Sequence, residues 1–359
     1  IHAGLHVHRH GKGAARLTRE TLKGMSDGSL NMVFGTHAVL SESVSWHDIG
    51  FIGIDEQHKF GASQRDVLLH VRDDGHVPDM MMQTATPIPR SIAQVYYGDI
   101  TYLRLSEPPS GRLPIITKWV RSSGGSLLSD ASNDIWSDII SEARNGHGTF
   151  IICPMVEDSP KLAAASVRKS HDVIQGIMNA HGINVGMVYG SQDRDEQAKA
   201  IEDFRSGAIP LLVASSVVEV GVSCEPATRM VVLDANRFGL ASLHQIRGRI
   251  GRGSAQGVCW LVANAFTPSS RNRMEAMVGT TDGWALAKAD MRNRGSGTLL
   301  GDIQHGASDF RYANLIDDGD WVGEARRKAI EVLSSPSAAD ALSDARKWFG
   351  MDEDMGILS

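Results

Sequence analysis

The chain has 359 residues, a formal net charge of −6 and a pI near 6.2, with 42% hydrophobic and 22% charged residues. These values are typical of a globular protein of about two domains, and they exclude a uniformly basic nucleic-acid-binding protein. No apolar run approaches the length of a membrane span. The three cysteines, Cys153, Cys224 and Cys259, form no CxxC pair, so we expect buried thiols in a reducing compartment, the cytoplasm.

Short apolar runs recur along the chain and predict β-strands. Their near-continuous apolarity is typical of strands that are covered on both faces, as in parallel sheets. The segment between two of them predicts a helix, because Asp193 and Glu196 have the spacing of a capping box. Ala198, Ile201 and Phe204 fall on one face of this helix, which favours a doubly wound α/β fold. The runs lie at residues 30–36, 49–56, 79–86, 149–155, 183–190, 209–216, 229–235 and 257–264.

The predicted elements divide into two α/β domains and a helical end. The segment 108–126 is rich in Pro, Gly and Ser, which predicts a boundary there. We expect a first domain over 1–115 that is short by several strands, and a complete second domain over 116–285. Residues 286–359 are expected to form a Gly-rich connector followed by helices.

The second apolar run, residues 49–56, ends with two adjacent carboxylates, Asp55 and Glu56. Open α/β sheets place ligands at the carboxyl ends of their strands. One carboxylate there can hold Mg²⁺ through water, and its neighbour can orient or deprotonate an attacking water. The alternative is a solvated strand end that carries two acids.

Basic residues gather in the second half of the chain, where they could form a local patch. Within the segment HQIRGRIGRG, residues 244–253, Arg249 and Arg252 share one face if the segment is helical. Guanidinium groups suit phosphate oxygens and can stabilise a transferring phosphoryl group. Gly248 and Gly251 weaken a plain surface helix and indicate close backbone approach. The patch comprises Arg237, Arg247, Arg249, Arg252, Arg271, Arg273, Lys288, Arg292 and Arg294.

Two further strand ends carry polar residues. Thr84 and Thr86 follow the third run and could link a nucleotide site to a neighbouring domain, or simply cap a Pro-rich turn. Gly35, Thr36 and His37 follow the first run. Their backbone amides and hydroxyl could hold a phosphodiester, or cap a helix.

The order and spacing of these segments are more specific than any one of them. The segments GTHAVL, DEQHKFGASQR, TATPIPRS, VASSVVEVGV and QIRGRIGRG occur in this order across the two predicted domains. The chain therefore resembles superfamily 2 helicases, and more narrowly the RecG-like family, in which DEQHRFGVxQR and ERFGLAQLHQLRGRVGRG are typical. Gln57 and His58 favour this family over the transcription-repair coupling translocases, which usually carry DEEQRFG there.

The resemblance implies two RecA-like parallel-sheet domains, the first one truncated, followed by a small, mostly helical C-terminal region. It implies that Asp55 binds the Mg²⁺ of ATP through water and that Glu56 activates the hydrolytic water. Arg249 and Arg252 would reach the γ-phosphate from the second domain, and Gln245 would help to position that site.

The same resemblance implies roles in coupling and in DNA binding. Gly35, Thr36 and His37 would line the DNA track. The segment DMRNRGSGTLLGDIQHG, residues 290–306, resembles the hook motif of the family. This motif would convert closure of the motor into translocation along DNA. The residues expected to couple nucleotide state to movement are Gln57, His58, Thr84 and Thr86, together with Arg294 and Gln304 of the hook. Glu219 and Gly221 are expected to bind the nucleotide, as part of a motif that senses both DNA and nucleotide.

The sequence departs from the family pattern at several points, which include Ser296 and Thr298 in the hook and Ser215 and Ser216 in place of two Thr. Ser223 stands where the family usually has Asp. No GxxxxGK[ST] motif, which holds the β- and γ-phosphates, occurs in the 359 residues. We therefore expect the C-terminal portion of a motor, without the wedge domain that splits branched DNA, and little ATP hydrolysis by this chain alone.

The expected function is ATP-driven remodelling of branched double-stranded DNA, such as forks and Holliday junctions, in repair and recombination. The expected form is a monomeric motor without membrane contact, and a single-stranded-DNA-binding protein is a further candidate partner. Two alternatives remain open. One is a non-catalytic DNA-binding or interaction fragment, and the other is a relative of the coupling translocases.

Overall fold

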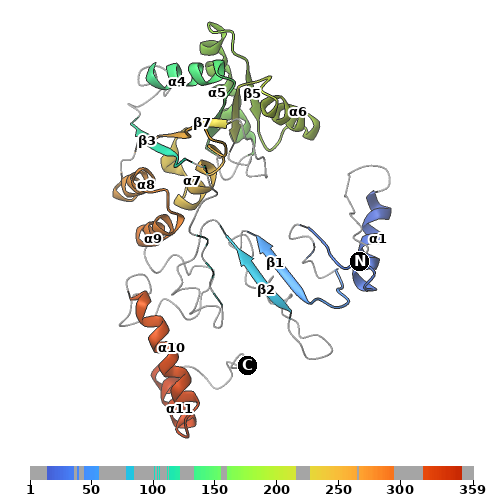
Figure 1. The fold of residues 1–359 in the computed structure, drawn as a ribbon, viewed down its shortest axis with the longest axis vertical. Helices are drawn as coiled ribbons and strands as arrows, with labels where there is room; N and C mark the ends of the chain where they lie inside the picture. Colours follow the sequence, from blue (N-terminus) through green and yellow to red (C-terminus); the bar gives the residue numbers. More distant parts are fainter. Residues whose placement is uncertain are drawn as a thin grey trace. The chain divides into compact units, whose positions relative to one another are not determined.

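The computed structural model describes residues 14–35, 39, 44–55, 78–84, 101, 103, 105, 111, 113–121, 133–154, 160–215, 227–264, 267–294 and 318–349. The chain forms two compact units, Ile1–Ala85 and Thr86–Ser359, which are treated separately below (Figure 1). The sequence-based division at 115/116 and 285/286 stays a prediction. Strand β3 starts at Ile116, and helix α9 (Gly283–Arg294) crosses the second of these positions.

The first unit contains a helix and a pair of parallel strands. Helix α1 spans Ala14–Ser26, strand β1 spans Phe51–Asp55 and strand β2 spans Asp79–Gln83. The strands confirm the second and third apolar runs. The prediction of a strand at 30–36 is wrong for its described residues, 30–35, which form no ladder. Met32 and Phe34 are largely exposed there, so apolar residues alone did not make a strand.

The second unit is built on a six-stranded sheet in the order β3-β8-β7-β4-β6-β5. Every neighbouring pair in this sheet is parallel, which confirms the predicted parallel α/β class. Five of its strands match predicted runs. The strands span Ile116–Val120 (β3), Gly148–Cys153 (β4), Val185–Val188 (β5), Leu211–Ser215 (β6), Ala227–Val232 (β7) and Val258–Val262 (β8).

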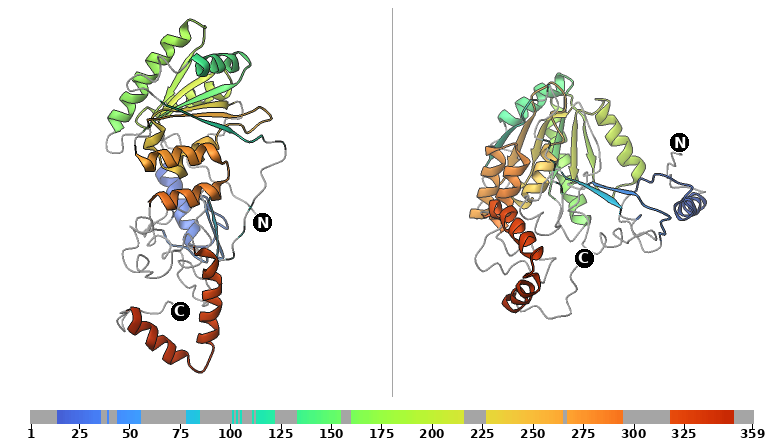
Figure 2. Two further views of the ribbon diagram at one scale, coloured as in Figure 1. Left: turned by 90° about the vertical axis from the view of Figure 1, so that its left-hand side faces the viewer. Right: turned by 60° about the horizontal axis from the view of Figure 1, so that its bottom comes forward.

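Helices cover both faces of this sheet, which explains why its central strands read as continuous apolar runs (Figure 2). Alternate residues of each strand point to opposite faces. Ile151 joins the core of α4 and α5, whereas Ile152 joins the core of α6, α7 and α8. The helices span Asn133–Arg144 (α4), Pro160–Asn179 (α5), Arg194–Arg205 (α6), Leu240–Arg247 (α7) and Pro268–Gly279 (α8), with a 3₁₀ turn at Ala235–Arg237 (η4).

Helix α6 shows how local signals fix an element. Asp193 is its N-cap, and its carboxylate accepts a hydrogen bond from the backbone N–H of Asp195 at 2.8 Å. The cap therefore forms without the expected partnership with Glu196. Phe204 is buried as predicted, but Ala198 is exposed and Ala200 packs against the core in its place.

The C-terminal part of the second unit is helical, as predicted. Helices α10 (Gly319–Leu333) and α11 (Ala338–Phe349) contact each other. Among the helices that the structure describes, none combines the length and the apolarity that crossing a membrane requires.

Candidate functional site

The two strands of the first unit bring predicted site residues to one sheet edge. Asp55 is the last residue of β1, and its Cα pairs with Gln83, the last residue of β2. Thr84 follows directly, so Asp55 and Thr84 lie at adjacent strand ends on the carboxyl edge. Asp55 is exposed and Thr84 is half-buried. An exposed carboxylate at such an edge fits a water-mediated Mg²⁺ contact.

Other predicted residues of the first unit lie outside the described residues. Of the expected DNA-track residues, Gly35 is described and exposed. A Cβ at Gly35 would overlap Cγ1 of Val39, so a larger residue would require the Val39 side chain to shift. The residues that the structure does not describe are Thr36, His37, Glu56, Gln57, His58 and Thr86.

In the second unit, α7 leads into a turn that carries both predicted catalytic arginines. The helix ends at Arg247, with Gly248 as its C-cap. Arg249 and Arg252 would share one face only if their segment were helical, and this condition is not met because both residues follow the end of the helix. Arg249 still donates its backbone N–H to the carbonyl of Ile246, but Gly251 has left the helix and donates to the carbonyl of Ala227 at 3.0 Å. We call residues 248–253 the arginine turn.

Gly251 makes the arginine turn possible. Its φ of +62° is in the left-handed region that favours glycine. A Cβ at this position would lie 3.3 Å from Cα of Gly257 and 3.5 Å from Cγ1 of Ile115. The predicted close backbone approach is confirmed at Gly251. At Gly248 a Cβ would make only ordinary contacts, 3.4 and 3.5 Å from the carbonyl oxygens of Gln245 and His244.

The arginine turn lies at the amino edge of the six-stranded sheet. Ala227, which accepts the hydrogen bond from Gly251, is the first residue of β7. Arg249 is half-buried and Arg252 is exposed. A guanidinium group on a fixed turn at the surface suits a phosphate oxygen, because few degrees of freedom are lost when it binds.

Arg247, which the sequence offered only as one member of a basic patch, is buried and structural. Only 2% of it is exposed. Its Nη1 donates to the carbonyl oxygens of Met277 and Thr280, at 2.8 and 3.0 Å, and to Oγ1 of Thr117 at 3.1 Å. Burial lowers the pKa of this guanidinium below its usual value. Arg247 therefore ties α7 to β3 and to the end of α8.

His244 lies one helical turn before Arg247 and accepts from it. Burial, followed by the positive charge of Arg247, lowers the pKa of His244 to about 4. The imidazole is therefore neutral near pH 7, and its Nδ1 can accept a hydrogen bond from Nη2 of Arg247 at 3.2 Å.

Arg273 on α8 is a second member of the patch with a structural contact. Its Nη1 and Nη2 donate to the carbonyl oxygens of Phe238 and Asn236, at 2.9 and 3.0 Å. These two residues lie just before α7. Arg273 thus anchors the start of the helix and Arg247 anchors its end, so α7 is held at both ends.

A buried ion-pair cluster supports the segment that follows the arginine turn. Arg229 on β7 donates from Nε and Nη2 to the carboxylate of Asp138 on α4, at 2.5 and 3.1 Å. Its Nη1 donates to the carbonyl of Gln256 at 2.8 Å, and the Gln256 amide donates to the carbonyl of Pro114 at 2.5 Å. The bidentate pairing of Arg229 with Asp138 gave no signal in the sequence, because the two residues are far apart along the chain.

Gln245, expected to help position the phosphate site, lies in the second half of α7. Its Nε2 is buried and has no hydrogen-bond partner among the described residues. The hydroxyl of Ser215, the last residue of β6, has the same property. A buried donor without a partner is costly, so each is a place where a ligand atom or water would be favourable.

The remaining predicted residues of the second unit lie at the limit of the described chain or beyond it. Arg294 is the last residue of α9, and its side chain is not described. Glu219, Gly221 and Gln304 lie outside the described residues.

Comparisons with known proteins identify the family of the chain. The model of the helicase conserved C-terminal domain matches residues 131–254, from just before α4 to the end of the arginine turn. The chain is 36% identical over 331 residues to the ATP-dependent DNA helicase RecG of Streptococcus pneumoniae serotype 4, which covers 92% of this chain and 47% of the relative. It is 35% identical over 317 residues to RecG of Bacillus subtilis strain 168, covering 88% and 45%. A solved structure of RecG bound to a three-way DNA junction matches with a TM-score of 0.56 and 29% identity, covering 86% of this chain and 38% of that chain.

The chain belongs to the RecG-like family of superfamily 2 helicases. It spans about half the length of the curated relatives that it matches. Family membership confirms the resemblance that the motifs indicated and the RecA-like class of the parallel-sheet units. The RecG-like motif at 244–253 is thus, in this structure, the end of α7 followed by the arginine turn.

Proposed function

We propose that this chain is the motor portion of a RecG-like ATP-dependent DNA helicase that remodels branched double-stranded DNA in the cytoplasm. The observation that carries the proposal is the arginine turn. It presents Arg249 and Arg252 from a backbone fixed by Gly251, directly after a helix held at both ends. An ordinary surface turn does not need a fixed backbone and an anchored helix. A guanidinium group that binds a phosphate in one geometry benefits from both.

Bound ATP with Mg²⁺ supplies the phosphoryl group whose transfer to water releases the energy for movement. The carboxylate of Asp55 would hold the metal through water, and Glu56 would accept the proton of the attacking water. Arg249 and Arg252 would stabilise the negative charge on the transferring phosphoryl group, and Gln245 would donate its unpartnered N–H toward the same group.

Coupling of ATP hydrolysis to movement on DNA would use two further sets of residues, one that contacts DNA and one that responds to nucleotide state. Gly35, Thr36 and His37 would contact the DNA backbone. The coupling residues would change their contacts with nucleotide state, and one of them, Thr84, lies at the strand end next to Asp55. These residues are Gln57, His58, Thr84, Thr86, Arg294 and Gln304, while Glu219 and Gly221 would bind the nucleotide.

The 359 residues contain no P-loop motif, which favours a second candidate for the chain by itself, a DNA-binding module without nucleotide turnover. Backbone amides and the lysine of that loop are the groups that hold the β- and γ-phosphates. We therefore expect the isolated chain to bind branched DNA and to hydrolyse ATP no faster with DNA than without it.

A coupled assay of ATP hydrolysis, with and without a three-way DNA junction, tests this expectation. Junction binding by fluorescence anisotropy serves as the control for folded protein. DNA-stimulated hydrolysis by the 359-residue chain would contradict the expectation that it is inactive alone. Absence of any junction binding would contradict the DNA-remodelling function.

A further inference from the structure

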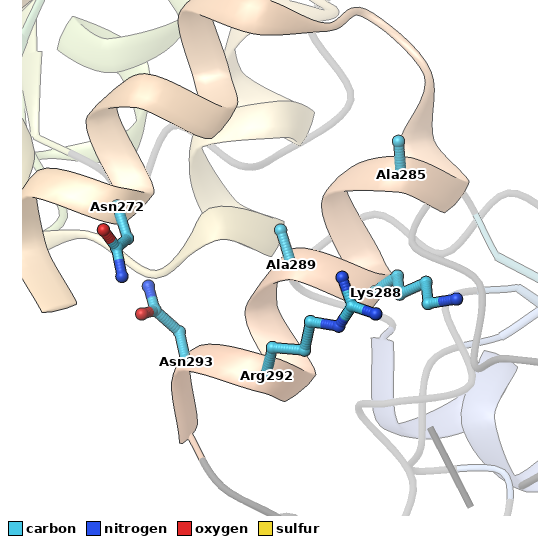
Figure 3. Close-up of a pocket in the computed structure, with 6 residues that line it drawn as sticks. All are labelled: Asn272, Ala285, Lys288, Ala289, Arg292 and Asn293. Carbon is cyan, nitrogen blue, oxygen red and sulfur yellow. The ribbon is translucent and has the colours of Figure 1, made fainter. Parts of the chain in front are cut away.

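A basic groove lies between α8 and α9 and is separate from the arginine turn. Two of its residues, Arg292 and Asn293, fall within the hook segment 290–306, but neither is given a role in the function proposed above. Its volume is about 410 Å³, and it is open to solvent (Figure 3). Lys288 and Arg292 lie one helical turn apart on α9 and are exposed. The lining residues are Asn272, Ala285, Lys288, Ala289, Arg292 and Asn293.

The side chains of the groove combine charge with neutral donors. Figure 3 shows the amides of Asn272 on α8 and Asn293 on α9 turned toward one another at one end of the groove, with Lys288 and Arg292 along α9. Ala285 and Ala289 leave the space beside the cations open.

The groove is preformed, because the two helices that make it are fixed to the core. Met274, Met277 and Leu286 are buried, so both helices are anchored by apolar side chains. The Asn293 amide donates to the carbonyl of Ser269 at 3.0 Å and joins the end of α9 to the start of α8. Arg247 holds the other end of α8 through the carbonyls of Met277 and Thr280.

This chemistry suits the backbone of a nucleic acid better than a base or a free nucleotide. Two cations at a spacing of four residues and two amides provide charge and hydrogen bonds for phosphodiester oxygens. None of the six lining residues is aromatic, so the groove offers no surface on which a base could stack. The chain as a whole carries a charge of −6 and therefore repels a polyanion, so any attraction has to come from a local basic patch such as this one.

We propose that the α8–α9 groove binds the phosphate backbone of duplex DNA through Lys288 and Arg292, with Asn272 and Asn293 as neutral donors. The inference rests on the proposed function, because it gives a DNA-remodelling motor an additional contact with its track. It adds a contact surface on α8 and α9 to the DNA-track residues expected in the first unit.

The salt dependence of DNA binding by the 359-residue chain tests this site. Binding of a labelled DNA junction is measured by fluorescence anisotropy between about 50 and 200 mM salt, where counterion release dominates. The double variant Lys288→Ala/Arg292→Ala should bind about 10-fold more weakly at about 100 mM salt. Its slope of log K against log salt should be shallower by roughly 2, because each lost phosphate contact removes about 0.9.

A matched control removes two exposed cations from α6. Arg194→Ala/Lys199→Ala makes the same change in net charge, and both residues are exposed. The control should keep the slope and affinity of the unmodified chain. The charge-reversed variant Lys288→Glu/Arg292→Glu should weaken binding further than the alanine variant, and circular dichroism checks that each variant is folded.

The outcomes separate the groove from the function on which it rests. If the unmodified chain binds DNA and the alanine variant keeps the same slope and affinity, the groove assignment is overturned while the DNA function stands. An equal loss in the α6 control also overturns it, because the effect would then be one of net charge. If the unmodified chain binds no DNA, both proposals are overturned.

Discussion

At the scale of single residues, burial separates arginines that look alike in the sequence. Arg247 and Arg252 occur in one short basic motif, yet Arg247 is buried among carbonyl oxygens and Arg252 is exposed. A buried guanidinium with several acceptors supports the fold, and loss of its hydrogen bonds leaves those acceptors unpaired. The two arginines should therefore respond differently to substitution.

We predict that Arg247→Lys lowers the free energy of unfolding by about 3 kcal/mol. A lysine cannot reach Thr117, Met277 and Thr280 in the same planar geometry. Arg194→Lys, on the exposed face of α6, should change stability by less than about 0.5 kcal/mol. Urea unfolding monitored by circular dichroism measures both. Equal, small effects of the two substitutions would show that Arg247 does not hold α7 in place.

His244 gives the fold a dependence on pH whose sign follows from its lowered pKa. In the unfolded chain its pKa is near 6.5, and in the folded chain it is about 4. The unfolded state therefore binds the proton first as pH falls, and stability is lost between about pH 6.5 and pH 4. The loss from this residue should be on the order of 2 kcal/mol, after allowance for its partial exposure.

The variant His244→Asn isolates this contribution, because Asn keeps an acceptor near Nδ1 and does not titrate. Urea unfolding at pH 7 and pH 5 should show a smaller loss for this variant than for the unmodified chain. Identical losses in the two proteins would mean that other groups account for the pH dependence.

At the scale of elements, the turn after α7 depends on a single glycine. Gly251→Ala should destabilise the protein by about 1–3 kcal/mol, because the residue has a positive φ and its Cβ would meet the backbone of Gly257 at 3.3 Å. Gly248→Ala is the control, since Gly248 has φ −63° and ordinary contacts. Thermal unfolding compares the two. A variant at Gly251 as stable as the one at Gly248 would contradict the role given to this turn.

The elements also show what the sequence could and could not predict. The central strands were predicted because helices on both faces make them uniformly apolar, as at β4 and β6. β3 was missed because it lies within a Pro- and Gly-rich segment, and its burial alternates between exposed and buried residues. The run at 30–35 has apolar residues but no described strand partner, so pattern alone gave a wrong strand.

The sequence predicted some residues of the candidate site and could not predict the roles of others. Motif spacing predicted Asp55 and Thr84, which the register places at adjacent strand ends. It could not distinguish the structural Arg247 and Arg273 from Arg249 and Arg252, because burial depends on contacts with α8 and β3 that are far away in sequence. The end of α7 at Arg247 was also not evident, since the glycines that follow fit both a helix and a turn.

At the scale of the whole molecule, two separate units carry complementary chemistry. The first has a carboxylate and a hydroxyl at the carboxyl edge of β1 and β2. The second has guanidinium groups on a fixed turn at the amino edge of its sheet. Phosphoryl transfer requires carboxylates that hold a metal ion and orient a water molecule, and cations that stabilise the charge on the transferring phosphoryl group.

The most direct test of this account is ATP hydrolysis by a hybrid motor, in which this chain follows the N-terminal half of the Streptococcus pneumoniae relative. The hybrid should hydrolyse ATP faster when a branched DNA is added. Glu56→Gln should lower its kcat by about 100-fold or more while nucleotide binding, measured with a fluorescent ATP analogue, stays intact. An unchanged kcat in the Glu56→Gln hybrid would remove Glu56 from the chemistry and contradict the motor interpretation.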